Sequence, residues 1–306
     1  MFTLAHLSDI HLGPLPGGAA WRNFRMKRVV GSLSWRFQRR KLHDAGVAAL
    51  IAEDILRAAP DHVAVTGDIV NVAAEDEFPR AARFLERLGG PADLSFVPGN
   101  HDVYVKTDWG RCLAHLAPWM EGDMRVKRTV TTAEIAEPFP YVRLRKNVAL
   151  LGLSTARPQA LHRAGGTLGT EQVASAGEVL RDLRERGYAR VVLIHHPPLP
   201  GQAIPRKALT DAAELRDMLV REGAELVLHG HNHMNMHEAL ATRFGACHVI
   251  GVASASMVTD AHADLATWNN FRIARQAGRW AITMRRHSYV PASRLFQAGP
   301  EVPLST

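Results

Sequence analysis

The chain has 306 residues, of which 46% are hydrophobic and 22% are charged, and its net charge is +7. These proportions are ordinary for a globular protein with a substantial core. The two cysteines, Cys112 and Cys247, are far apart in the sequence, which argues against a disulfide scaffold or a zinc ribbon and fits a reducing compartment. The sequence shows no signal peptide and no apolar run long enough to span a bilayer, so we expect a cytoplasmic protein.

The positive charge is concentrated in one segment near the N-terminus. No acidic residue occurs between Asp9 and Asp44. Eight basic residues in that interval account for more than the whole net charge: Arg22, Arg25, Lys27, Arg28, Arg36, Arg39, Arg40 and Lys41. The basicity therefore belongs to this segment and needs a local explanation.

Strand-like and helical patterns alternate along the first 230 residues. Short runs rich in Val, Ile and Leu occupy residues 2–7, 62–66, 94–97, 148–153, 190–194 and 225–228. Apolar residues recur at helical spacing within residues 42–58, 171–186 and 211–221. This alternation predicts an α/β fold in which helices cover a sheet of buried strands.

The pattern changes after His233. Residues 236–241, 247–252, 271–277 and 280–287 are predicted to be strands of an antiparallel set. We expect a single domain over residues 1–290, with a basic amphipathic insertion at about 17–41. Residues 291–306 are predicted to be a loosely held tail. The C-terminal strands offer an edge for a homodimer.

Five polar motifs follow five of the apolar runs. They are Asp9-Ile-His11, Gly67-Asp68-Ile-Val-Asn71, Gly99-Asn100-His101-Asp102, His195-His196-Pro197 and His229-Gly230-His231-Asn232-His233. Loops converge at the carboxyl ends of strands in open α/β sheets, so the motifs can form one site. Nitrogen and oxygen ligands without a thiolate suit Zn, Mn or Fe. Two such ions can hold a hydroxide for in-line attack on a phosphoryl group.

The ordered set of motifs resembles the calcineurin-like metallophosphoesterase superfamily over roughly residues 2–250. This resemblance implies a four-layer αββα sandwich of mixed sheets with flanking helices. It also implies two divalent or trivalent metal ions. Asp9, His11 and His233 would bind the first ion. Asn100, His195 and His231 would bind the second, and Asp68 would bridge both.

The resemblance also implies the catalytic groups. His101 would contact the phosphate and protonate the leaving oxygen, with Asp102 placed to orient its imidazole. Neither the Gly-Asp nor the Asn-His motif is followed by the residues typical of Ser/Thr protein phosphatases. The chain instead looks similar to phosphodiesterases, including the bacterial class III cyclic nucleotide enzymes.

Three residues are candidates for substrate binding: Asn71, Arg157 and His196. Arg157 lies in a loop with His162 and Arg163 that can reach over the metals and hold a phosphate. The alternative interpretation of that loop is ordinary surface polarity.

Residues 21–41 combine basic and aromatic side chains with one apolar stripe if they form a helix. Met26, Val29, Val30, Leu33 and Phe37 make the stripe. Such a helix is typical of a membrane interface, where each basic residue contributes about 1 kcal/mol near an anionic leaflet. The membrane-binding candidates are Trp21, Phe24, Arg25, Arg28, Trp35, Arg36, Phe37, Arg39 and Arg40. A helix packed on the core with a solvated basic face is one alternative, and a nucleic-acid surface is another.

The insertion directly follows the first motif and should therefore lie at the rim of the metal site. Leu12-Gly-Pro-Leu-Pro16 and the Trp/Arg-rich stretch are also similar to a proteobacterial branch with phospholipase C-like activity on phosphatidylcholine.

The leading hypothesis is a dinuclear metal-dependent phosphodiesterase acting on a membrane phospholipid, peripheral on the inner face of the membrane. The alternatives are a soluble 3',5'-cyclic nucleotide phosphodiesterase, a nuclease and a non-catalytic scaffold.

Overall fold

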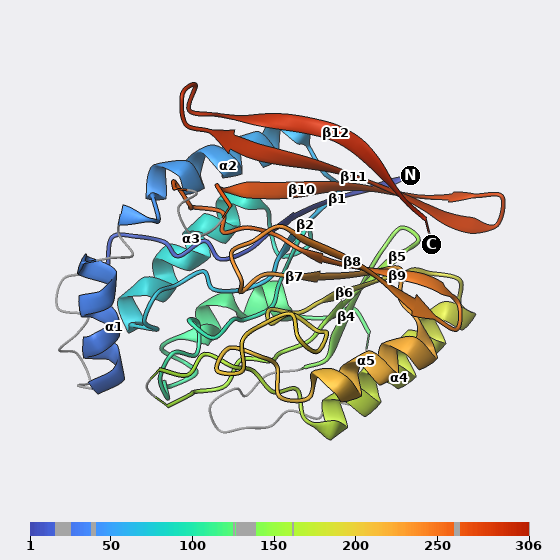
Figure 1. Ribbon diagram of the computed structural model, residues 1–306, viewed down its shortest axis with the longest axis horizontal. Helices are drawn as coiled ribbons and strands as arrows, with labels where there is room; N and C mark the ends of the chain where they lie inside the picture. The colour runs from blue at the N-terminus through green and yellow to red at the C-terminus, as the bar shows by residue number, and fades with distance from the viewer. Residues whose placement is uncertain are drawn as a thin grey trace.

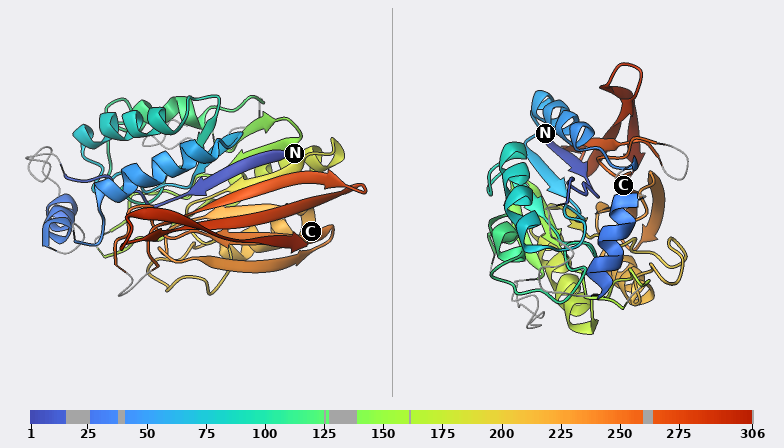
Figure 2. Two further views of the ribbon diagram at one scale, coloured as in Figure 1. Left: turned by 90° about the horizontal axis from the view of Figure 1, so that it is seen from above. Right: turned by 90° about the vertical axis from the view of Figure 1, so that its left-hand side faces the viewer.

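Two six-stranded sheets pack face to face, and helices cover their outer faces (Figures 1 and 2). The computed structural model describes residues 1–15, 26–37, 41–124, 126, 139–160, 162–259 and 264–305. Both sheets are mixed, so the expected αββα sandwich is confirmed.

The first sheet has the strand order β12-β11-β10-β1-β2-β3. Its parallel part contains β1 (Phe2–Leu7), β2 (His62–Val65) and β3 (Leu94–Phe96). Its antiparallel part contains β10 (Thr267–Gln276), β11 (Arg279–Val290) and β12 (Leu295–Ser305). Helices α2 (Ala45–Ala58) and α3 (Phe78–Leu88) flank this sheet (Figure 1).

The second sheet has the order β4-β5-β6-β7-β9-β8. Its strands are β4 (Tyr141–Arg145), β5 (Val148–Gly152), β6 (Ala189–Leu193), β7 (Leu226–His229), β8 (Met236–Thr242) and β9 (Gly245–Gly251). Helices α4 (Thr170–Glu185) and α5 (Ala212–Glu222) cover its outer face. Along β5 and β6, Leu150 and Leu193 join the core between the sheets, whereas Leu151 and Val192 join the core beneath the two helices. Both faces are buried, which explains the continuous apolar runs.

The C-terminal region differs from the prediction in two ways. The tail expected from residue 291 onward is wrong, because Leu295–Ser305 forms β12 and pairs with β11 from Val290↔Leu295 to Ala281↔Ser305. The late strands also do not form one antiparallel set, since β8 and β9 belong to the second sheet and β10–β12 to the first. Helix α3, strand β4 and the short 3-10 turns Glu75–Glu77 and Leu113–Met120 were not predicted.

Helix α1 (Met26–Phe37) lies at the end of the molecule opposite the two chain termini (Figures 1 and 2). That is the end toward which the parallel strands direct their carboxyl ends, so α1 lies on the same side as the five motifs. Among the described residues, no helix has both the length and the apolar character needed to span a bilayer.

Candidate metal centre

The five motif loops meet beyond the carboxyl ends of β1, β2, β3, β6 and β7. The amide of Asp9 donates to the Gly67 carbonyl at 2.9 Å, which joins the first two loops. Gly67 has φ +95°, and a Cβ there would lie 2.5 Å from the Gly99 amide nitrogen. A Cβ on Gly230 would collide with Ser8 and Asp9. Only glycine permits these close approaches, which bring side chains from separate loops together.

Asp9, His11 and His233 form one half of the site. Asp9 Oδ1 lies 3.2 Å from His233 Nε2 and 4.0 Å from His11 Nε2. The two imidazole nitrogens are 3.3 Å apart. Asp9 and His11 are buried and His233 is half-buried, so the three donor atoms meet at a point that is accessible from the His233 side.

Asn100, His195 and His231 form the other half. His195 Nε2 lies 3.2 Å from Asn100 Oδ1 and 3.2 Å from His231 Nδ1. Asp68 Oδ2 is 3.4 Å from His195 Nε2, and Asp68 also clusters with Asp9. The carboxylate of Asp68 therefore lies between the halves, as the predicted bridging role requires.

The imidazoles are oriented by their second ring nitrogens. His195 Nδ1 bonds the Thr66 carbonyl at 2.7 Å, His231 Nε2 bonds the Lys207 carbonyl at 2.9 Å, and His11 Nδ1 lies 3.4 Å from the Val70 carbonyl. A carbonyl accepts only from a protonated ring nitrogen. When the ring is neutral, its other nitrogen is then the unprotonated donor that a metal needs.

The residues present fit two metal ions. Asp9 Oδ1 is buried and accepts no hydrogen bond within the described residues. Burial raises the pKa of Asp9, but His233 and His195 outweigh it and lower the pKa. The pKa of Asp68 is lowered well below its usual value by His195 and His101 despite burial. Two ionised carboxylates, one amide oxygen and four imidazoles suit borderline metals such as Zn, Mn or Fe.

The imidazole of His195 carries a proton that a metal ion must displace. Burial lowers its pKa, but the Asp68 carboxylate outweighs burial and raises it to about 9. A metal must replace this proton, so binding at the second half releases protons into solution.

Five of the seven ligand candidates adopt left-handed backbone conformations. They are Asp9 (φ 54°), His11 (46°), Asp68 (53°), His231 (73°) and His233 (56°). Side chains other than glycine rarely adopt this region, and each instance costs about 1–3 kcal/mol. These five account for nearly half of the eleven non-glycine residues with positive φ in the described part of the chain, and each of them turns a candidate ligand into the site.

His101 lies beside this centre, but Asp102 does not orient it. His101 Nδ1 bonds the backbone carbonyl of Asn71 at 2.5 Å. The Asp102 carboxylate instead accepts four backbone N–H groups, from Asp68, Ile69, Val70 and Gly99, at 2.8–3.1 Å. The orienting role predicted for Asp102 is therefore wrong. Asp102 ties the second motif loop to the third, while the Asn71 carbonyl fixes the imidazole of His101.

Two of the substrate-binding candidates also have structural contacts. Both ring nitrogens of His196 are bonded, Nδ1 to Thr155 Oγ1 at 2.7 Å and Nε2 to the Ala164 carbonyl at 3.0 Å. His196 belongs to the imidazole cluster around His195, but these bonds make it a support and contradict a substrate contact. Asn71 is buried, and its Nδ2 donates to the Leu12 carbonyl at 2.8 Å. Asn71 therefore also supports the loops rather than facing a substrate.

Arg157 remains a predicted substrate ligand. It is half-buried in the loop that follows β5, and its guanidinium donates to the Ala156 carbonyl at 2.8 Å. Two residues further on, the Gln159 carbonyl accepts a 2.9 Å hydrogen bond from Lys27 of α1. The loop therefore lies against the insertion.

The insertion packs differently from the prediction. Arg28, expected at a membrane surface, is 4% exposed and donates to the carbonyls of Val72 and Ala73 at 3.4 and 2.7 Å. Trp35 is half-buried, and a Cβ on Gly13 would lie 3.0 Å from its indole. The helix thus turns Arg28, Gly31 and Trp35 inward. The membrane assignment of Arg28 is wrong.

The structure describes only part of the rest of the predicted membrane-binding segment. Leu33, from the predicted apolar stripe, is 50% exposed, so part of that stripe faces outward. The other candidates lie outside the described part of the chain: Trp21, Phe24, Arg25, Arg39, Arg40 and the side chains of Arg36 and Phe37.

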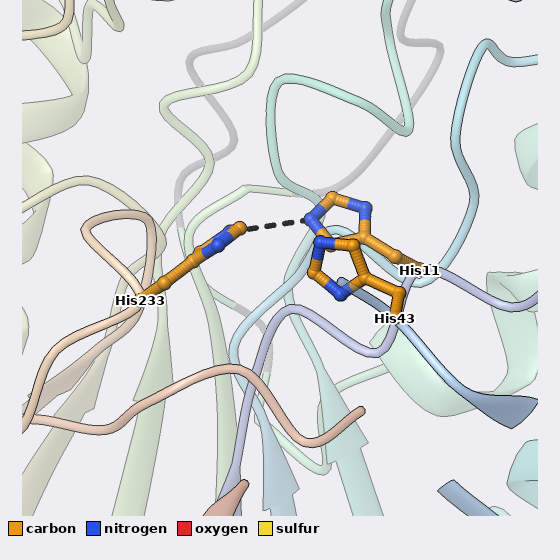
Figure 3. Close-up of side chains that lie close together, drawn as sticks. All are labelled: His11, His43 and His233. Carbon is orange, nitrogen blue, oxygen red and sulfur yellow. Dashed lines mark hydrogen bonds between the residues drawn. The ribbon is translucent and has the colours of Figure 1, made fainter. Parts of the chain in front are cut away.

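Two aromatic residues near the centre were missed by the sequence reasoning. Tyr104 stacks on His101, and His43 lies against His11 and His233 (Figure 3). Tyr104 follows the third motif by two residues, and His43 directly precedes Asp44, the N-cap of α2. A helix that follows a parallel strand often begins near the strand's carboxyl end. Because His43 lies just before such a helix, its position in the sequence could have indicated that it is near the motif loops.

Comparisons with known proteins agree with the fold and the site. A family model described as calcineurin-like phosphoesterase matches residues 2–235. Glycerophosphodiester phosphodiesterase GpdQ of Enterobacter lignolyticus (strain SCF1) is 30% identical over 203 residues, which cover 64% of this chain and 57% of that protein. The chain therefore matches less than two thirds of this relative's length.

Solved structures with low sequence identity share the fold. A dimetal phosphatase from Danio rerio has a TM-score of 0.62 at 12% identity, over 97% of this chain and 98% of that chain. Purple acid phosphatase PPD1 from yellow lupin (Lupinus luteus) seeds has a TM-score of 0.56 at 13% identity, over 99% of this chain and 53% of that chain. The match of the family model to most of the sequence, together with the geometry of the five motifs, shows that this chain belongs to the calcineurin-like phosphoesterase family.

Proposed function

We propose that this protein is a dinuclear metal-dependent phosphodiesterase whose favoured substrate is a membrane phospholipid, cleaved as by a phospholipase C. The family and the seven ligand candidates support hydrolysis of a phosphoester. Two bound metal ions would supply Lewis acidity and an activated nucleophile. Mn, Fe and Zn all accept this ligand set.

The residues of the chain have separate tasks in this reaction. Asp9, His11 and His233 would hold the first ion. Asn100, His195 and His231 would hold the second, and Asp68 would contact both. His101, fixed through Nδ1 by the Asn71 carbonyl, would hold a proton at Nε2 for the leaving oxygen. Arg157 would bind a phosphate oxygen from the loop beside α1.

One observation carries the choice of a lipid substrate: a single side chain, Tyr104, separates α1 from the proposed catalytic imidazole of His101. Tyr104 stacks on His101 with centroids 5.2 Å apart. On its other side Tyr104 touches α1, where a Cβ on Gly31 would lie 2.7 Å from its hydroxyl oxygen. Lys27 of α1 lies 4.4 Å from the Tyr104 ring centroid. The same helix exposes Leu33 in a strongly basic segment, as suits an anionic bilayer surface.

A soluble glycerophosphodiester is the second candidate. The curated relative is named a glycerophosphodiester phosphodiesterase, and such a molecule has the same phosphodiester and head group as a phospholipid without its acyl chains. A 3',5'-cyclic nucleotide, a nucleic acid and a non-catalytic role complete the alternatives.

A substrate panel with the purified, Mn²⁺-loaded protein tests the proposal. We expect release of phosphocholine from phosphatidylcholine vesicles containing anionic lipid, together with sedimentation of the protein with the vesicles. Turnover of glycerophosphocholine or cyclic AMP without vesicle binding would replace the lipid with the corresponding soluble diester. Binding to DNA or RNA that falls steeply with salt would favour a nuclease.

A further inference from the structure

A third imidazole, His43, lies against the two imidazoles of the first metal half. Its ring centroid is 4.7 Å from that of His11 and 5.5 Å from that of His233, and those two rings are 5.2 Å apart. One ring nitrogen of each residue lies within 4.8 Å of the others. Figure 3 shows the three rings turned toward a common point. His11 and His43 are buried and His233 is half-buried, so the cluster opens to solvent only on the His233 side.

These separations are those expected of three imidazoles around one ion. A metal–nitrogen distance of about 2.1 Å places a ring centroid about 3.2 Å from the metal. Ligands at angles of about 90–110° then have centroids about 4.5–5.3 Å apart. The observed separations fall within or just above this range.

The ring of His43 has the orientation of two of the four candidate ligand imidazoles, those of His11 and His195. Its Nδ1 lies 2.8 Å from Ser256 Oγ and 3.3 Å from Ser254 Oγ, and Nε2, on the other side of Cε1, is the nitrogen available for a metal in this orientation. His11 and His195 likewise direct Nδ1 to an oxygen and Nε2 to the metal centre. An outer hydrogen bond of this kind fixes the ring and raises its strength as a ligand.

The backbone around His43 is held from two sides. The Asp44 amide donates to the Ser256 carbonyl at 2.9 Å, and the Val258 amide donates to the Leu42 carbonyl at 2.9 Å. On the other side, Asp44 caps α2 by accepting from the Gly46 amide at 2.6 Å. The position of His43 is therefore built into the fold.

We propose that His43 is a third imidazole ligand of the first metal ion, an inference that rests on the dinuclear site of the proposed function. The first ion would then have five protein donors, from Asp9, His11, His43, His233 and Asp68. The second ion would have four, from Asn100, His195, His231 and Asp68. The first half should therefore bind more tightly, and its added nitrogen favours Fe or Zn over Mn.

The test measures metal binding directly. Apoprotein is titrated with Mn²⁺ and Zn²⁺ by calorimetry, and metal content is measured after dialysis. In His43→Asn, the amide keeps a hydrogen bond to Ser256 but removes Nε2. We expect the tighter site to weaken by at least about tenfold while the weaker site is unchanged.

A matched control removes a buried imidazole elsewhere. His62 is buried at the start of β2, and its Nε2 bonds Ser95 Oγ at 2.9 Å. His62→Asn should bind both metals as the wild type does. Pulsed electron paramagnetic resonance of the wild type with one equivalent of Mn²⁺ adds a measurement that needs no variant, and should count three coordinated imidazoles.

The outcomes separate this inference from the proposed function. Equal affinities in His43→Asn and the wild type, or two imidazoles at the tighter site, would overturn the role of His43. A wild type that binds two metals but hydrolyses no phosphodiester would overturn the proposed function, while the titration would still decide the role of His43. A wild type that binds fewer than two ions would overturn both.

Discussion

Tyr104 stacks on His101, with ring centroids 5.2 Å apart and ring planes 14° apart. The same tyrosine touches Gly31 of α1. Helix α1 and the imidazole of His101 are thus both in contact with the Tyr104 side chain. A shift of α1 on binding a surface would reach His101 through Tyr104, without any change in the metal ligands.

Tyr104→Ala should therefore lower kcat and leave metal content unchanged. Removing the ring frees His101 to leave the orientation set by the Asn71 carbonyl, and we expect a loss of about tenfold, below the 100-fold or more of a lost acid. The measurement is kcat on bis(p-nitrophenyl) phosphate, with metal content determined in parallel. Tyr188, another half-buried tyrosine, is the control, and Tyr188→Ala should have wild-type kcat. A loss of metal from Tyr104→Ala would contradict the positioning role.

Asp68→Ala should abolish hydrolysis and reduce the metal content. Asp68 is the carboxylate between the two halves, so its loss affects both ions at once. Removing a residue that only hydrogen-bonds a metal ligand typically lowers metal affinity or activity about 10- to 100-fold. Asp68 is itself a candidate ligand, so we expect its removal to lower activity by more than about 100-fold. Activity and metal content per chain are the measurements. Asp182→Ala, on the exposed side of α4, should change neither, and an active, metal-replete Asp68→Ala would refute the site.

Leu33→Asp should selectively reduce activity on vesicles. Leu33 is 50% exposed on α1, and a carboxylate there opposes an anionic bilayer. Leu56, 47% exposed on α2, provides the matched control. We expect Leu33→Asp to lower vesicle binding and lipid turnover while hydrolysis of bis(p-nitrophenyl) phosphate stays unchanged, and Leu56→Asp to affect neither. Equal lipid turnover in the two variants would remove α1 from substrate delivery.

Asp54→Asn should destabilise the protein in a pH-dependent manner. Asp54 accepts hydrogen bonds from Trp268 Nε1 and His287 Nδ1, both at 2.9 Å, and so joins α2 to β10 and β11. Burial raises its pKa, but these bonds and Arg57 outweigh burial and lower the pKa. The ionised form therefore stabilises the fold above the unfolded pKa of about 3.9, and this contribution is lost as the pH falls through the lower folded value.

Denaturant unfolding at several pH values measures this effect. At pH 7 the free energy of unfolding of Asp54→Asn should be about 1–3 kcal/mol below that of the wild type. The difference should shrink as the pH falls below about 4. Glu53→Gln on the same helix removes an exposed pair with Arg87 and should change stability by less than about 1 kcal/mol. A pH-independent difference would show that the lost packing, not the charge, is responsible.

Strand prediction succeeded where burial on both faces leaves a continuous apolar run. The predicted strands of the parallel parts lie within one residue of their observed positions, as with β1 at Phe2–Leu7. β12 was missed because it is a mostly exposed edge strand containing Pro300 and Pro303. An edge strand tolerates proline because it has partners on one side only, so its sequence resembles a loop.

The sequence by itself determined which candidate metal ligands come together, because five motifs at the ends of five strands meet at one edge of a layered α/β fold. Only the tertiary structure decided the supporting roles. The bonds of Asp102 to the amides of residues 68–70, the inward turn of Arg28 and the approach of His43 to His11 depend on groups distant in the sequence. A ligand is recognised by its own chemistry, whereas a support is defined by its neighbours, and packing alone selects those neighbours.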